Sequence, residues 1–162
     1  MASLLHVAVG LAASRLYLGR VSLPGALAFA ALSMLPDADV VAFVLDIPYS
    51  DPFGHRGASH SLAFAAGMGV LVGGISRRVK LGLLVAAVVA SHPLLDSLTD
   101  GGLGVALWWP WEDARVFAPW RPIPVAPIGA GFLSMRGLTV MLAELLPSLP
   151  LLLYGLWPAR KG

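Results

Sequence analysis

Apolar runs with few charges between them are the feature that most constrains the fold of this chain. They cover residues 3–19, 21–36, 59–75, 81–98 and 137–157. Hydrophobic residues make up 57% of the chain and charged residues 12%, whereas soluble domains carry about a quarter charged residues. A soluble domain of 162 residues could not bury so much apolar surface. The sequence therefore predicts an all-α polytopic membrane bundle with about five membrane segments.

The chain is expected to form one membrane-embedded domain over residues 1–162. Four of the apolar runs lie within residues 1–98, and residues 137–157 form the final membrane helix. Between them, residues 99–136 form a long outer loop segment, which is expected to contain a small hairpin or a short helix because long structureless loops are uncommon. Residues Val40–Ile47 are apolar but too short to span, so they predict a short interfacial or re-entrant helix.

Most of the basic residues cluster in three places, which predicts the orientation of the chain in the membrane. The clusters are Arg15 with Arg20, Arg77 with Arg78 and Lys80, and Arg160 with Lys161. Positive residues prefer the cytoplasmic side, so the N-terminus is expected outside and the C-terminus in the cytoplasm. In that topology all four histidines, together with Asp37, Asp39, Asp96 and Asp100, fall at the outer ends of helices or in outer loops.

The composition narrows the partners and the chemistry. The net charge of +2 rests on few charges, and no basic run is interleaved with exposed aromatic residues, so no nucleic-acid partner is expected. The chain has no cysteine, so any metal must be held by nitrogen and oxygen atoms. Imidazoles and carboxylates suit Zn²⁺ in particular. The four histidines and up to four aspartates would suffice for one ion, or for two ions bridged by a carboxylate.

The stretch His55–Ser61 concentrates two imidazoles, a guanidinium and two hydroxyls in seven residues. Arg56 lies between the two histidines and has two interpretations. It would grip an anionic substrate group such as a phosphate, or it would pair with Asp51 or lipid headgroups. Glu144, alone in the last apolar run, is either a packed polar contact or a site residue. Asp100, in a Thr-Asp-Gly-Gly sequence, is either a turn residue or part of the site.

The tryptophans of the outer loop segment are typical of an interfacial aromatic belt, with substrate stacking as the alternative. Three arginines near them are expected to meet lipid headgroups: Arg115, Arg121 and Arg136.

Three motifs in the first hundred residues carry a family resemblance. Leu35-Pro36-Asp37-Ala38-Asp39, His55–Ser61 and Ser91–Asp96 resemble the motifs of the YdjM-type inner-membrane metal-dependent hydrolases. Ser59 stands where that family usually has threonine and keeps the hydroxyl group. The resemblance implies a set of metal ligands: His6, Asp37, His55, His60, His92 and Asp96. It implies that Asp39 is a further ligand or supports the ligands. The residue types are also loosely similar to those of zinc phospholipase C and related all-α nucleases.

The expected function is that of a membrane-bound metal-dependent hydrolase with one or two divalent ions, zinc in the first place. Water activated by the metal would attack an ester bond, most plausibly a phosphate ester of a lipid or a lipid-like anionic substrate. Asp39 or Asp100 is expected to act as general base, and Arg56 and Ser59 are expected to contact the substrate. The site is expected on the extracytoplasmic face of the inner membrane, in contact with membrane lipid.

The alternative is a metal-ion transporter or sensor without hydrolytic turnover. A transport path would continue polar residues toward the cytoplasmic half of the bundle. The inner halves of the runs 59–75 and 81–98 have no such residues before the basic turn, which favours the enzyme.

Overall fold

The protein is an all-helical bundle, as predicted. The computed structural model describes residues 4–157. Its α-helices are α1 (Leu4–Leu18), α2 (Leu23–Met34), α3 (Val41–Val44), α4 (Leu62–Ser76), α5 (Val79–Ser97) and α6 (Met135–Leu156). Three 3₁₀ helices accompany them: η1 (Leu35–Val40), η2 (Ala58–His60) and η3 (Gly129–Leu133). Within the described range only two isolated β-bridges form, and no strand.

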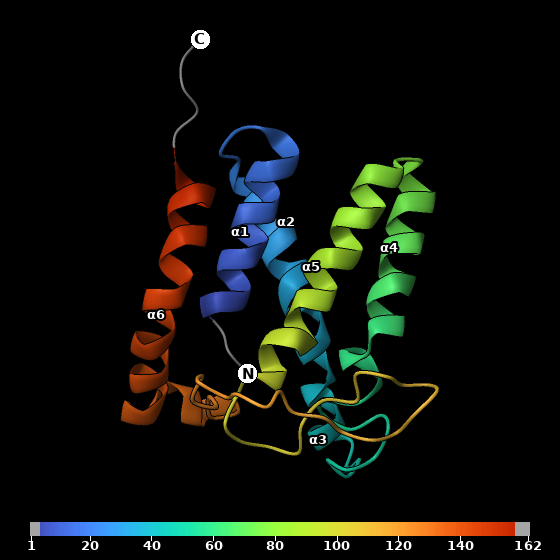
Figure 1. Ribbon diagram of the computed structural model, residues 1–162, viewed down its shortest axis with the longest axis vertical. Coiled ribbons are helices and arrows are strands. Elements are labelled where there is room, and N and C mark those ends of the chain that lie inside the picture. The colour runs from blue at the N-terminus through green and yellow to red at the C-terminus, as the bar shows by residue number, and fades with distance from the viewer. Residues whose placement is uncertain (1–3, 158–162) are drawn as a thin grey trace.

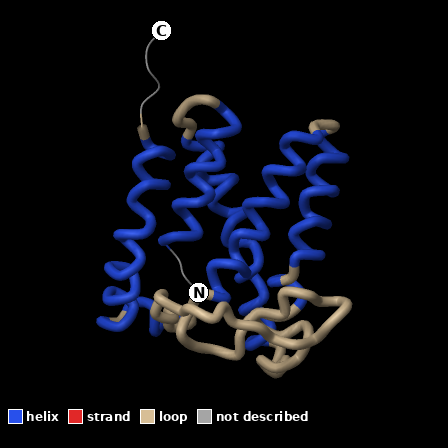
Figure 2. The backbone as a smooth tube through the Cα atoms, viewed as in Figure 1, coloured by secondary structure: helices blue, strands red, loops and turns tan. Residues whose placement is uncertain are grey.

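The long loops all lie at one end of the bundle, which we call the loop end (Figure 1, Figure 2). It comprises residues 45–61 and 98–134. Helices α1, α4 and α6 begin at this end, and α5 ends there (Figure 1). Short connections join α1 to α2 and α4 to α5 at the opposite end, which we call the turn end. The helix termini near the loop end are those that carry the predicted ligands.

The basic clusters lie at the turn end wherever the structure describes them. Arg15 and Arg20 belong to the connection after α1, and residues 77–80 belong to the connection between α4 and α5. The predicted third cluster, Arg160 and Lys161, lies outside the described residues.

Within residues 4–157, three helical segments are long and apolar enough to cross a membrane: Leu23–Val44, Val79–Ser97 and Met135–Leu156. Two further apolar helices, α1 and α4, are shorter. The segment Leu23–Val44 extends beyond the predicted apolar run 21–36, because the helix continues past Pro36. Proline has no N–H to donate, so the α-helical pattern is interrupted there, but the chain continues as the 3₁₀ helix η1 and then as α3. Pro36 therefore changes the winding from α-helical to 3₁₀ but does not end the helical segment.

Glycines allow the helices to pack closely. A Cβ on Gly69 would lie 2.7 Å from the carbonyl oxygen of Gly82, and one on Gly82 would lie 2.9 Å from the Cα of Gly73. This contact joins α4 to α5, and Gly69 and Gly73 have the small-xxx-small spacing that is common where membrane helices pack closely. Gly10 packs in the same way against α2, and Gly155 against α1.

The loop segment after α5 is fastened to itself and to the helix ends. Val105 and Val116 exchange backbone hydrogen bonds of 3.0 and 2.9 Å, which close a hairpin-like loop around the tryptophans. A parallel bridge pairs Thr99 with Ile123. The amide of Ala106 donates to the carbonyl of Arg56, so this segment also covers the His55–Ser61 motif.

Candidate metal centre

Four buried side chains from three separate segments meet at the loop end. Asp37 comes from η1, His60 from η2, and His92 and Asp96 from consecutive turns of α5. One ligand atom from each lies within 4.8 Å of the others. A second group shares one member with the first and consists of Asp37, Asp39 and His55. Asp37 therefore stands where two ion sites would meet.

The atoms facing the centre of this cluster have the chemistry of metal ligands. His60 Nε2 lies 3.7 Å from Asp37 Oδ1, and His92 Nε2 lies 3.4 Å from the same oxygen. Among the described residues, both Nε2 atoms and both Asp37 oxygens are buried and make no hydrogen bond. Buried polar atoms without partners are costly and rare. A divalent cation bound by these nitrogen and oxygen atoms would satisfy all of them, so the residues fit such an ion.

Asp39 orients two of the histidines. Its Oδ1 lies 2.6 Å from His55 Nδ1, and its Oδ2 lies 3.0 Å from His60 Nδ1. The hydroxyl of Ser59 donates to the same Oδ2 at 2.5 Å, as does the backbone amide of Arg56 at 3.0 Å. Carboxylates that hold the far nitrogen of a histidine fix the direction of its ligating nitrogen. The loop from His55 to His60 is thus folded around a carboxylate supplied by η1.

The other two histidines are fixed by backbone atoms. His92 Nδ1 donates to the carbonyl of Ser33 at 2.7 Å, which turns its Nε2 toward Asp37. His6 packs on His92 with ring centroids 3.9 Å apart, and its Nε2 lies 3.9 Å from Asp96 Oδ1. His6 therefore borders the four-residue group without belonging to it.

Arg56 is completely engaged by the protein. Its Nε lies 2.9 Å from Asp96 Oδ2 in a buried ion pair. Its two Nη atoms donate to the carbonyl of Gly101 at 2.9 Å and to the hydroxyl of Thr99 at 3.1 Å. The guanidinium thus pairs with a cluster residue, and not with Asp51 as one sequence interpretation expected.

The cluster has an excess of negative charge. Asp37, Asp39 and Asp96 are shielded from solvent, and among residues 4–157 only one guanidinium, that of Arg56, is buried with them. Burial lowers the pKa of His60, but the three carboxylates outweigh it and raise that pKa to about 10. The surroundings of His60 therefore favour a positive charge at the centre of the cluster. A bound cation would supply such a charge.

The remaining sequence candidates lie around the cluster. Asp100 is in neither group, because its Oδ1 accepts from the amide of Val125 at 2.7 Å. Ser61 caps α4 by accepting from Phe64 N. Glu144 is buried in α6, where it accepts from the amides that begin α1, at Leu4 and Leu5. It is a packed polar contact that docks the helix carrying His6.

Sequence reasoning missed the role of Arg115. It donates to the carbonyls of His55 and Tyr49 at 2.8 Å each and to that of Asp51 at 2.9 Å, where the sequence suggested lipid headgroups. Burial is the main cause that lowers the pKa of Arg115, and the nearby Tyr49, Asp39 and Asp51 oppose this shift. Its partners lie about sixty residues earlier in the chain. No local spacing in the sequence could therefore have indicated that Arg115 bonds to this loop.

Comparison with known proteins agrees with the motifs. No solved structure is significantly similar to this chain. The chain is 42% identical to the inner membrane protein YbcI of Escherichia coli strain K12 over 169 residues, which covers 96% of each chain. The family described as YdjM inner membrane protein matches residues 1–160. With both matches covering nearly the whole chain, the protein belongs to the YdjM family of inner membrane proteins.

Proposed function

We propose that this protein is a membrane-bound metal-dependent hydrolase that cleaves an ester bond of a lipid-like substrate, most plausibly a phosphate ester. The observation that carries the proposal is the buried His/Asp cluster, in which Asp37 belongs to two overlapping ligand groups. Asp37, His60, His92 and Asp96 would hold one ion, and Asp37, Asp39 and His55 a second. Zn²⁺ suits these ligands best. Such an ion would supply Lewis acidity and lower the pKa of a water molecule at the site.

The chain's own residues have distinct roles in this proposal. Asp39 holds the Nδ1 atoms of His55 and His60 and so aims their rings. Because both its oxygens already accept hydrogen bonds, we assign it to positioning in preference to proton transfer. Asp100 remains the candidate base, bonded to a residue that lines the neighbouring cavity. Arg56 balances Asp96 and keeps that carboxylate in place.

The distribution of buried charge favours this function over transport. Seven of the eight buried ionisable side chains of the described range belong to the cluster or border it: His6, Asp37, His55, Arg56, His60, His92 and Asp96. The eighth, Glu144 in the middle of α6, accepts from the amides that begin α1. An ion path would need polar groups that continue to the turn end. Among the described residues, the other buried polar groups of the helices beyond the cluster are uncharged hydroxyls such as Ser14 and Ser148.

The test is the His60→Ala variant, purified in detergent and examined by elemental analysis and by hydrolysis of phosphodiester and phospholipid substrates. We expect the wild-type protein to contain a divalent metal and to hydrolyse a substrate of this class. His60→Ala should lose both, by more than the roughly 10–100-fold that removal of a supporting residue costs. Thr139→Ala, an exposed hydroxyl on α6, is the matched control and should change neither.

Two results would contradict the proposal in different ways. Stoichiometric metal in His60→Ala would remove His60 from the ligands. Metal binding by the wild-type protein without hydrolysis of any ester would favour the transporter or sensor.

A further inference from the structure

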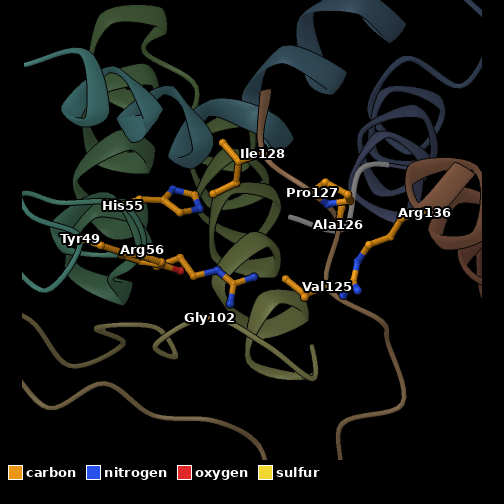
Figure 3. Close-up of a pocket in the computed structure, with 9 residues that line it drawn as sticks. All are labelled: Tyr49, His55, Arg56, Gly102, Val125, Ala126, Pro127, Ile128 and Arg136. Carbon is orange, nitrogen blue, oxygen red and sulfur yellow. The ribbon is translucent and has the colours of Figure 1, made fainter. Parts of the chain in front are cut away.

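A cavity of about 300 Å³ opens beside the metal cluster, on the side of His55. One wall carries the polar side chains of Tyr49, His55 and Arg56. The opposite wall is formed by the mainly apolar residues 125–128 and by Arg136 (Figure 3). His55 belongs both to this wall and to the second ligand group. A molecule in the cavity would therefore lie next to the cluster.

Two arginines reach into this cavity from opposite sides, and only one of them has partners. Arg56 is fixed by Asp96, Thr99 and the carbonyl of Gly101. Arg136, in the first turn of α6, is exposed and makes no hydrogen bond or ion pair with any residue that the structure describes. Figure 3 shows its side chain directed toward the cavity, facing the guanidinium of Arg56. The charge of Arg136 is thus available to a ligand.

Gly102 keeps the polar wall open. A Cβ there would lie 2.7 Å from the hydroxyl of Tyr49 and 3.0 Å from Arg56 Nη1, and the φ of Gly102 is +86°. The missing side chain leaves both groups facing the cavity. Donors and cations, without an opposing carboxylate among the lining residues, suit an anion.

Exposed apolar side chains lie beside the α6 side of the cavity. Ile128 is 41% exposed, and Leu133 and Met135, next to Arg136, are 90% and 77% exposed. Exposed apolar side chains at the end of a membrane helix are expected to contact the bilayer. A ligand entering from this side would present an apolar part to these residues and an anionic part to the arginine.

We propose that this cavity binds the phosphate or phosphonate-like group of an amphiphilic molecule and that Arg136 is the residue that recognises the anion. This inference rests on the proposed function, because it makes the cavity the substrate site of the hydrolase. It places the specificity for an anionic headgroup on α6, about eighty residues after Arg56 in the chain. Arg56, which the sequence suggested for this role, forms part of the cavity wall and is fixed there by its own partners.

The test measures binding of hexylphosphonate and of inorganic phosphate to the purified full-length protein in a neutral maltoside detergent, by titration calorimetry. The C–P bond of hexylphosphonate resists ester hydrolysis, so binding is measured without turnover. Arg136→Gln should weaken hexylphosphonate binding about tenfold or more, the effect of losing a charge-assisted contact. Arg121→Gln is the matched control: this exposed arginine of the loop end lies over the Phe117 ring and does not line the cavity. It should change the Kd less than about twofold.

Unchanged binding by Arg136→Gln would overturn the inference, and so would an equal loss in Arg121→Gln, which would indicate only general attraction by positive charge. Weaker binding of inorganic phosphate than of hexylphosphonate supports a lipid headgroup as the ligand. Equal binding of both also supports the anion site and assigns it to free phosphate.

Hydrolysis assays on the same preparations separate this inference from the proposed function. Arg136-dependent binding without turnover of any ester would overturn the hydrolase and leave the anion site standing. Turnover of an anionic phosphodiester that is equal in wild type and Arg136→Gln would overturn the anion site and leave the hydrolase standing.

Discussion

Asp39 shows how one side chain acts on the His/Asp cluster through its neighbours. It receives hydrogen bonds from a backbone amide and from the Ser59 hydroxyl, and it holds the Nδ1 atoms of His55 and His60. A histidine whose Nδ1 is held in this way can present only Nε2 to a metal. Asp39 therefore sets the direction of two ligands at once.

Replacing Asp39 with asparagine should weaken metal binding without abolishing it. Asparagine keeps the size of the side chain but loses the charge and one acceptor, and comparable losses cost roughly 10–100-fold in metal affinity. Competition with a chromophoric chelator measures this affinity. Asp100→Asn, the same change outside both ligand groups, should leave the affinity unaltered.

Wild-type affinity in Asp39→Asn would show that the orientation of the two rings does not depend on the carboxylate. Complete loss of metal would show that Asp39 is needed to bind the metal itself and not only to orient the two rings.

The sequence indicates that Arg56 lies in a site, but it does not predict the partners of Arg56. The spacing of His55 and His60 around Arg56 indicates a site, because polar atoms are costly in an apolar chain. The ion pair with Asp96 joins positions forty residues apart. The hydrogen bonds that Arg56 donates to Gly101 and Thr99 depend on the path of a loop without regular structure. No periodicity encodes such contacts.

At the scale of helices, contact between α4 and α5 holds the ligands of two segments in register. α5 carries His92 and Asp96, and α4 directly follows the loop that carries His60. The two helices approach through Gly69, Gly73 and Gly82, whose hydrogens face the backbone of the partner helix. A change at this contact is therefore transmitted to the relative position of the ligands.

Gly82→Ala should destabilise the protein by about 1–3 kcal/mol, the usual cost of overpacking. Its Cβ would lie 2.6 Å from the carbonyl oxygen of Gly69, and backbone atoms cannot move aside as a flexible side chain can. Thermal unfolding in detergent, followed by tryptophan fluorescence, measures the effect. Gly74→Ala is the matched control because a Cβ at Gly74 meets nothing within 4 Å. It should be neutral or stabilise the protein by up to about 1 kcal/mol, since alanine restricts the unfolded chain. Equal effects in the two variants would mean that the α4–α5 contact can relax.

The helices themselves could largely be predicted, and the change of winding at Pro36 could not. Apolar runs end within a few residues of the helices they predict, as for 81–98 and α5 (Val79–Ser97). A proline usually ends a helix or begins one, and the sequence of residues 35–40 does not distinguish an end from a 3₁₀ turn. The 3₁₀ winding matters because Asp37 and Asp39 lie within it.

At the scale of the molecule, the distribution of charge predicts which end faces the cytoplasm. Basic residues gather at the turn end, and the ligands gather at the loop end. The convergence of residues from several segments could be anticipated from topology alone, because alternate helix ends must share a face. The detailed site could not, since the cavity wall at residues 125–128 and Arg136 comes from a segment with no recognisable motif.

The orientation is testable because the chain contains no cysteine. Trp111→Cys places a single thiol on an exposed residue of the loop end, and Arg78→Cys places one at the turn end. In intact cells of a Gram-negative host, a maleimide that cannot cross the inner membrane should label Trp111→Cys, while Arg78→Cys should react only after lysis. The reverse pattern would put the metal cluster on the cytoplasmic side.

The loop wrapped around Asp39 also bears on how an ion would enter this protein. The rings of His55 and His60 are held by the carboxylate of Asp39, and the segment after α5 bonds to the backbone of the same loop. In small metal domains the ion itself drives folding, so that metal binding and folding are one event. Here hydrogen bonds and helix packing also hold the candidate ligands in place. We therefore expect a chelator to remove a bound ion without unfolding the helical bundle.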